Sequence, residues 1–368
     1  MPELEIIVIA IILVQACILP GVFLVLRGMS LMSDAISHAS LLGIVIAFFY
    51  ARSLDSPLLI ISAGLTGLVT VMITEWLIST KRLKEDAAIG LVFPLFFSIG
   101  VILISKYMGS IHIDSDCVLF GEIAFTPFER LNMFSYDLGP VALWIMSFIL
   151  IVNSSLTFIF YKELKISTFD KSLAHALGFS PILIHYGLMI MTSITAVGAF
   201  ESVGSILVVA LMITPPATAF LLTKRLSRMI IVSSIVGILS VLIGYLGAFA
   251  LDVSISGAIV SCSGLLFLIT LFFSPKSGLI IKVIKFNENK LTFSTRMLLV
   301  QLLDHEGKSN EILENTISNM ITHMNWPEKF AKKVAKFAVQ KNYILRSGND
   351  LKLTNFGREV AKHTLQWT

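Results

Sequence analysis

The chain has 368 residues, of which 55% are hydrophobic and only 14% are charged, and its mean hydropathy is +0.85. Soluble domains carry about 25% charged residues, so this composition excludes an ordinary soluble protein. The three cysteines show neither CxxC spacing nor a regular pairing, which argues against a disulfide framework and against a thiolate metal site.

Nine apolar runs recur along the chain, each close to the ~20 residues that a helix needs to cross a bilayer. They cover residues 4–27, 31–50, 57–78, 87–105, 138–161, 181–200, 202–222, 229–250 and 253–274. The part from 181 to 222 can form two spans or one span with a broken helix. The sequence therefore predicts an all-α polytopic membrane protein with about eight or nine transmembrane helices.

Lys and Arg residues are divided unequally between the two sides that these spans define. Within residues 1–285, the loops on one side hold thirteen of them and the loops on the other side hold three. Cytoplasmic loops are the more basic ones, so the first side is predicted to be cytoplasmic, with the N-terminus outside and the C-terminal tail inside. No Lys or Arg precedes Arg27, so a cleaved signal peptide is not expected.

An acid and an imidazole lie four residues apart inside the second apolar run, at Asp34 and His38. Ionisable residues in a membrane span are costly and usually mark an ion path, and on a helix these two share one face. Two ligands cannot complete the shell of a transition-metal ion. A second copy, or a homologous subunit with the same pair, would complete a site for Mn²⁺, Zn²⁺ or Fe²⁺. The alternative is that Asp34 caps the helix and His38 only hydrogen-bonds to it.

A second group of possible ligands alternates along a loop, at His112, Asp114 and Asp116. On an extended chain their side chains would share one face. They could contact a metal on the outer side of the membrane, or they could form a solvated acidic loop.

Gly204 and the pair Pro215 and Pro216 interrupt the apolar run that ends at residue 222. Proline removes a backbone hydrogen bond, and such breaks persist in membranes only where other groups or a cavity satisfy the freed carbonyls. A pliant transport helix and a simple packing kink both fit these residues.

A polar segment with its own helix caps, residues 167–178, lies on the predicted cytoplasmic side. Asp170 or Ser167 can accept the first free N–H groups of a short helix, and Gly178 can end it in the left-handed conformation. An amphipathic helix between two spans can enter a groove of a soluble partner. The chain has no G-x-x-x-x-G-K-[ST] motif, so nucleotide hydrolysis would need another subunit.

The chemistry of the chain changes after Ile280, which separates a predicted membrane domain (1–280) from a predicted tail domain (286–368). The tail contains 12 basic and 8 acidic residues and accounts for the whole net charge of +4. Its pattern predicts helices over 294–303, 309–324 and 327–341, strands at 343–345 and 351–353, and a last helix that Thr354 caps.

Three helices, a two-stranded wing and a closing helix outline a winged-helix domain. Lysines line its third helix, which suits nucleic acid, anionic lipid or a protein surface: Lys329, Lys332, Lys333 and Lys336.

Several motifs together resemble the ABC-3 family of permeases, the membrane subunits of manganese, zinc and iron ABC importers. In order, they are LRGMSLMSDAISHA at 26–39, AIGLVF at 88–93, LFG at 119–121, the 169–178 loop, residues 203–219, and Ser256, Gly257, Phe267 and Pro275. The likeness covers about residues 1–280. Ser33 stands where Gly is common in the family. The tail resembles the winged-helix part of metal-dependent regulators of the DtxR group, without an obvious metal set of its own.

The resemblance implies a transporter subunit that is not itself an enzyme, in the cytoplasmic (inner) membrane of a bacterium. Its implied partners are a second permease, identical or homologous, a cytosolic ABC ATPase dimer and an extracytoplasmic metal-binding protein. No cofactor would be bound permanently, since Mn²⁺, Zn²⁺ or Fe²⁺ is the transported substrate. Asp34 and His38 would bind that metal. The ATPase would push a coupling loop, and the residues of this chain that match the family's loop are Phe169, Asp170, Ala174 and Gly178.

Two other functions stay open at this point. The first is a secondary transporter that is driven by an ion gradient, with Asp34 as a proton or cation site. The second is a membrane-tethered regulator whose spans only anchor the basic tail.

Overall fold

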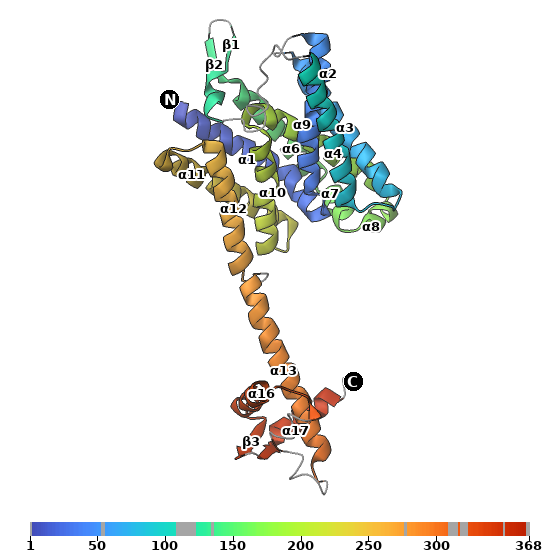
Figure 1. Ribbon diagram of the computed structural model, residues 1–368, viewed down its shortest axis with the longest axis vertical. Coiled ribbons are helices and arrows are strands. Elements are labelled where there is room, and N and C mark those ends of the chain that lie inside the picture. Colours follow the sequence, from blue (N-terminus) through green and yellow to red (C-terminus); the bar gives the residue numbers. More distant parts are fainter. Residues whose placement is uncertain are drawn as a thin grey trace. The chain divides into compact units, whose positions relative to one another are not determined.

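The computed structural model describes residues 2–52, 56–107, 123–133, 136–275, 278–307, 316, 323–348 and 350–365 (Figure 1). The chain divides into two compact units, Met1–Gly278 and Leu279–Thr368. Each unit buries its own cluster of apolar side chains, and the two clusters share no residue.

Helices make up almost the whole of the first unit. Among the described residues, nine helices are long and apolar enough to cross a membrane, which confirms a polytopic helical fold. The part from 181 to 222 forms two of them. The nine are α1 (Pro2–Arg27), α2 (Leu31–Ala51), α3 (Pro57–Ser79), α4 (Glu85–Tyr107), α6 (Val141–Ile159), α9 (Pro181–Val203), α10 (Ser205–Leu222), α11 (Leu226–Leu251) and α12 (Ile255–Phe273).

Short elements lie at the two ends of α6. A 3-10 turn, η1 (Ile123–Phe128), and an antiparallel hairpin of β1 (Arg130–Met133) and β2 (Tyr136–Pro140) precede it. Two short helices follow it, α7 (Tyr161–Phe169) and α8 (Lys171–Ala176). Because α6 separates them along the chain, the hairpin and α7–α8 belong to opposite ends of this helix.

The first helix forms the centre of the membrane unit. Inside its most apolar window 67% of residues are buried, against 17% for α12, and it packs on α6, α9, α10 and α11. A buried amide fixes three of these helices together: Asn153 Nδ2 on α6 donates to the Ala16 carbonyl on α1 (3.1 Å) and to Thr195 Oγ1 on α9 (2.7 Å). Such contacts satisfy polar groups inside a bilayer, where water offers no partner.

A close backbone contact joins α1 to α10 at the proline pair. Pro216 has no N–H, so the carbonyl of Met212, four residues earlier, loses its helical partner. That carbonyl lies directly against Gly21 of α1, where a methyl group would overlap it. Gly21 therefore allows α1 to cover the point at which α10 is irregular.

The second unit is a small α/β unit around one helical core. It contains α13 (Leu279–His305), α16 (Glu328–Gln340), the antiparallel strands β3 (Ile344–Ser347) and β4 (Asp350–Leu353), and α17 (Asn355–Leu365). Its core is formed by aliphatic side chains from all of these elements: Leu298, Leu299, Leu302, Ala331, Val334, Ala335, Ala338, Ile344, Leu351, Leu353 and Ala361.

The tail elements follow the predicted pattern apart from their first helix. Thr354 caps α17 as predicted, since its Oγ1 accepts the N–H of Gly357 (3.0 Å). The predicted helix at 294–303 instead begins at residue 279, because no Gly or Pro interrupts residues 279–305, and α13 therefore runs through residues 281–285. The predicted helix at 309–324 falls almost wholly outside the described residues.

An ion pair fixes the end of α13 to α17. Arg358 donates from Nε and Nη2 to Glu306 Oε1, at 2.8 and 2.6 Å. This bonding lowers the pKa of the Glu306 carboxyl below its usual value. Both side chains are more than 30% exposed, so solvent screens the pair and it contributes little to stability.

The contact at Gly21 yields a stability prediction. Replacing Gly21 with Ala should lower the stability of the detergent-solubilised protein by about 1–3 kcal/mol, because the new methyl group meets backbone and cannot be accommodated without a shift of α10. Thermal unfolding monitored by fluorescence measures this. Gly247→Ala on α11 is the matched control, since a methyl group there meets nothing within 4 Å. Equal melting temperatures for the two variants would contradict the close contact between Gly21 and the carbonyl of Met212.

Candidate functional site

Asp34 lies inside α2 and does not cap it. The helix begins at Leu31 with Ser30 at the N-cap, and Ser30 makes no capping hydrogen bond through its side chain. The serines of this first part bond back to their own helix: Ser33 Oγ donates to the Ser30 carbonyl (3.0 Å) and Ser37 Oγ to the Ser33 carbonyl (2.9 Å). The carboxylate of Asp34 is therefore not needed to start the helix.

The structure brings Asp34 and His38 together on one face of α2. His38 Nε2 lies 3.3 Å from Asp34 Oδ1. The imidazole is held from its sides by two rings of α4, with Phe93 stacked at 5.9 Å and Phe97 edge-on at 5.6 Å between ring centroids. These contacts leave the Nε2 edge facing the carboxylate.

This pair is partly open in the single chain. The side chain of Asp34 is 36% exposed and that of His38 is 24% exposed. Within the described residues, no three His, Cys, Asp or Glu side chains are arranged to hold a metal ion. The predicted outer-side residues His112, Asp114 and Asp116 lie outside the described residues. Among the described residues, Asp34 and His38 therefore have no third side chain of these four types beside them.

The 167–178 segment forms the capped helix that the sequence predicts. Asp170 Oδ1 accepts the N–H of Leu173 at 2.9 Å and so caps α8. Gly178 has φ +84°, and the N–H of Phe179 bonds to the Ala174 carbonyl at 3.0 Å, which closes the helix end. Ala174 is fully buried, whereas apolar side chains on either side of it are exposed: Phe169, Leu173 and Leu177.

The predicted helix breaks differ from one another in the structure. Gly204 separates α9 from α10 with φ 80° and ψ 164°, a conformation that favours glycine. Pro215 and Pro216 are buried inside α10 and do not end it. Only Gly204 is therefore a break between helices, and the prolines mark the irregular turn that Gly21 covers.

A polar cluster at the end of α1 was not predicted from the sequence. Arg27 donates from Nε to Thr168 Oγ1 (3.2 Å) and from Nη2 to Ser167 Oγ (3.3 Å), and its Nη1 lies 3.0 Å from His185 Nδ1. The other ring nitrogen of His185 pairs with the carboxylate of Glu75 on α3. The cluster thus joins α1, α3, α7 and α9.

The sequence holds a partial signal for this cluster. In the predicted topology Arg27, Glu75, His185 and the 167–178 segment all lie at cytoplasmic ends of spans. What the sequence does not give is which helices are neighbours at that face, so Glu75 and His185 look like isolated polar residues.

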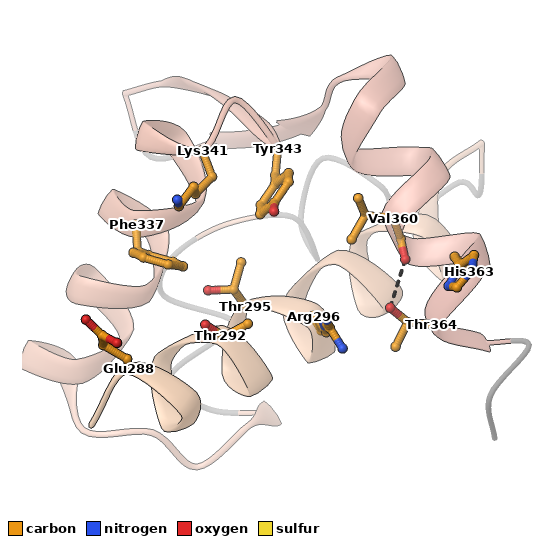
Figure 2. A pocket seen from close by; sticks show the side chains of 10 residues that line it. All are labelled: Glu288, Thr292, Thr295, Arg296, Phe337, Lys341, Tyr343, Val360, His363 and Thr364. Atoms are coloured by element: carbon orange, nitrogen blue, oxygen red, sulfur yellow. Dashed lines mark hydrogen bonds between the residues drawn. The ribbon is translucent and has the colours of Figure 1, made fainter. Parts of the chain in front are cut away.

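The tail unit carries an open hollow of about 800 Å³, shown in Figure 2. It lies among α13, α16 and α17: Phe337, Lys341 and Tyr343 are on the α16 side and Val360 is on the α17 side. All of its lining residues belong to the second unit. It is therefore not part of a path through the membrane helices.

Known proteins resemble this chain over most of its length. The zinc transport system membrane protein TroD of Treponema pallidum is 43% identical over 98% of both chains. The manganese transport system membrane protein MntD of Bacillus subtilis is 47% identical over 73% of this chain and 91% of its own length. Among solved structures, PsaBC from Streptococcus pneumoniae in complex with Fab has a TM-score of 0.61 and 34% identity, over 74% of this chain and 91% of that one.

A family description matches the membrane unit from end to end. The ABC 3 transport family covers residues 4–274, which include all nine candidate spans, the Asp34–His38 pair and the 167–178 segment. Together with the sequence identities of these relatives, the match shows that this chain is a membrane protein of the ABC 3 transport family.

Proposed function

We propose that this chain is the permease subunit of an ABC importer that moves a divalent transition metal, Mn²⁺, Zn²⁺ or Fe²⁺, into the cytoplasm. The single observation that carries the proposal is the family match over residues 4–274 with relatives described as zinc and manganese transport proteins. The nine apolar helices among the described residues would supply the path, and ATP hydrolysis would belong to a separate subunit.

Asp34 and His38 are the proposed metal ligands. Bonds of about 2.0–2.2 Å to nitrogen and oxygen place two ligands of one ion about 3.0–3.5 Å apart. The Nε2–Oδ1 distance of 3.3 Å is therefore already suitable for a shared ion. The flanking Phe93 and Phe97 hold the imidazole in this orientation, so little rearrangement is needed for binding.

Charge balance also favours a cation at this pair. Within the described residues, Asp34 has His38 as its ion-pair partner and no Lys or Arg. Glu75 on α3 has Arg27 close enough to balance it through the intervening His185. A carboxylate without a fixed cation inside a membrane span needs a transported ion or a proton to offset it.

A second permease is proposed to complete the metal shell. One chain offers one carboxylate and one imidazole, and transition metals take four to six ligands. The partial exposure of both side chains leaves them accessible to another subunit. A two-fold pair of chains would supply two carboxylates and two imidazoles.

The ATPase is proposed to bind at the capped 167–178 segment, which we call the coupling segment. Its helix α8 buries Ala174 and exposes Leu173, and Leu177, the C-cap residue one turn further on, is exposed as well. An exposed apolar stripe on a short, well-capped helix suits a groove on a soluble partner. Phe169 and Gly178 bound this stripe.

The tail is proposed to be a cytoplasmic winged-helix domain. Its order of helix α13, helix α16, hairpin β3–β4 and helix α17 supports that arrangement, and the positive-inside distribution of the membrane loops supports a cytoplasmic location. The exposed lysines of α16 suit a polyanion such as DNA. This role would accompany transport and not replace it.

The metal pair is tested by substitution. Asp34→Asn and His38→Gln should each lower ATP-dependent metal uptake into proteoliposomes by at least about 10-fold, since even residues that only support metal ligands cost about 10–100-fold when mutated. Ser37→Ala, between them on the same helix, is the control, because its hydroxyl bonds only to its own helix. Unchanged uptake in both ligand variants would contradict the proposal that Asp34 and His38 bind the metal.

The energy source separates an importer from a secondary transporter in the same vesicles. Metal entry that persists without the ATPase subunit or without ATP would contradict the proposal of an ABC importer and favour a secondary transporter.

The coupling segment is tested by assembly. Leu173→Asp should weaken association with the ATPase by at least about 10-fold, because burial of a leucine contributes about 1.5–3 kcal/mol and a charge in its place adds a desolvation cost. Co-purification at defined salt measures this. The control is Phe128→Asp, an exposed apolar residue at the other end of α6. Equal recovery of the ATPase with both variants would place its docking surface elsewhere.

Removal of the tail tests the tethered-regulator alternative. A chain that ends at Gly278, the boundary between the units, should retain ATP-dependent uptake, because the Bacillus subtilis relative matches over 91% of its length with only 73% of this chain. Uptake assays on the truncated complex measure this. If transport is lost although the complex assembles, the tail is part of the transport machinery.

A further inference from the structure

We propose that Arg27 is the positioning residue that connects the coupling segment to the metal-binding helix. Its guanidinium would transmit a displacement of α8 to α2 and to the Asp34–His38 pair. The inference rests on the proposed function of this chain as an ABC importer subunit, and it names a residue through which that function would operate.

The guanidinium bonds to the start of the coupling segment and to the helix after it. Ser167 and Thr168, its first two residues, accept from Nη2 and Nε. His185 on α9, seven residues beyond Gly178, accepts from Nη1. The three acceptors are about 140–158 residues away from Arg27 in sequence, so they are brought together only by the tertiary fold. A movement of the segment relative to α9 would therefore change the hydrogen bonds of Arg27.

The hydrogen bonds fix the orientation of His185 and extend the connection to α3. Arginine has only donors, so His185 Nδ1 must be the acceptor and the ring proton must be on Nε2. That Nε2 faces the carboxylate of Glu75, near the end of α3, and pairs with it. The result is one continuous path of donors and acceptors from α7 through Arg27 and His185 to α3.

Both ends of this path lead to α2. Helix α3 packs closely on α2, where a methyl group on Gly43 would overlap the backbone of Ser62. On the other side, Arg27 is the last residue of α1, and only Gly28, Met29 and Ser30 separate it from α2. Asp34 comes seven residues after Arg27.

The link between α1 and α2 is well defined. Gly28 adopts φ +77°, its N–H bonds to the Val25 carbonyl (3.2 Å), and the N–H of Met29 bonds to the Leu24 carbonyl (3.0 Å). This pair of bonds is the Schellman arrangement, in which glycine occupies the left-handed position after a helix. A fixed turn of three residues can pass on a movement that a flexible loop would absorb.

The acceptors that Arg27 bonds to also suit a residue whose contacts change during transport. Arg27 bonds directly to two hydroxyls and a neutral imidazole, and the carboxylate of Glu75 is one step further. Bonds to neutral acceptors are weaker than a bidentate pair with a carboxylate, and they can be exchanged between two arrangements at lower cost. Lysine would replace this residue only in part, because it keeps the positive charge but lacks the planar fork that serves three acceptors at once.

The test measures metal transported per ATP hydrolysed by the complete complex in proteoliposomes. Arg27→Ala should lower this ratio by about 2- to 30-fold, the range for residues that couple two sites, while ATP hydrolysis and assembly with the ATPase persist. Arg27→Lys should lower it less. Arg130→Ala is the matched control, since Arg130 pairs with Glu5 and Asp137 at the other end of α6 and should leave the ratio unchanged.

The outcomes separate this inference from the proposed function. If the parent complex shows no ATP-dependent uptake, the proposed function itself is wrong. If the parent transports metal and Arg27→Ala keeps the parental ratio, even with both activities reduced, Arg27 is a structural residue only and the inference is overturned. Should Arg27→Ala fail to assemble, the ratio in Arg27→Lys decides by the same criterion.

Discussion

The hydrogen bonding of the backbone in lipid is the constraint on which this structure depends. A bilayer offers no partner for a free carbonyl, so an irregular turn of a membrane helix persists only where neighbouring helices, polar side chains or a cavity shield or satisfy it. Pro216 frees the carbonyl of Met212, and α1 can cover it because Gly21 has no side chain. The buried amide of Asn153 on α6 goes further, because it donates a hydrogen bond to the Ala16 carbonyl of α1. The central position of α1 follows from these contacts.

The balance of side-chain charge distinguishes the two imidazole–carboxylate pairs of the membrane unit. His185 and Glu75 are joined to Arg27, so their negative charge is balanced within the fold. His38 and Asp34 have phenyl rings as neighbours and no fixed cation among the described residues. The first pair is a structural connection between helices, and the second has the charge and the openness of a site for a passing ion. Two similar residue pairs thus acquire different proposed roles from their surroundings.

Much of this architecture could be predicted from local sequence. Hydrophobic length indicated the spans, and capping chemistry indicated Asp170, Gly178 and Thr354, because each depends on residues that are adjacent in the chain. The cluster around Arg27 could not be found in this way, since its members come from four helices and only lateral packing brings them together. The length of α13 was also missed. Residues 279–285 contain no helix breaker, but the change in composition after Ile280 indicates a domain boundary at this point of the chain.

The separate cores of the two units explain how relatives can differ in length. In the tail, the small residues Ala331, Ala335 and Ala338 let α16 approach α13 closely, and the strands close this core without any residue of the first unit. The membrane unit likewise buries its own cluster. Neither core cluster therefore includes a residue of the other unit. The Treponema pallidum relative aligns over nearly the whole chain and the Bacillus subtilis relative over 73% of it, as expected if the tail adds a property that transport itself does not require.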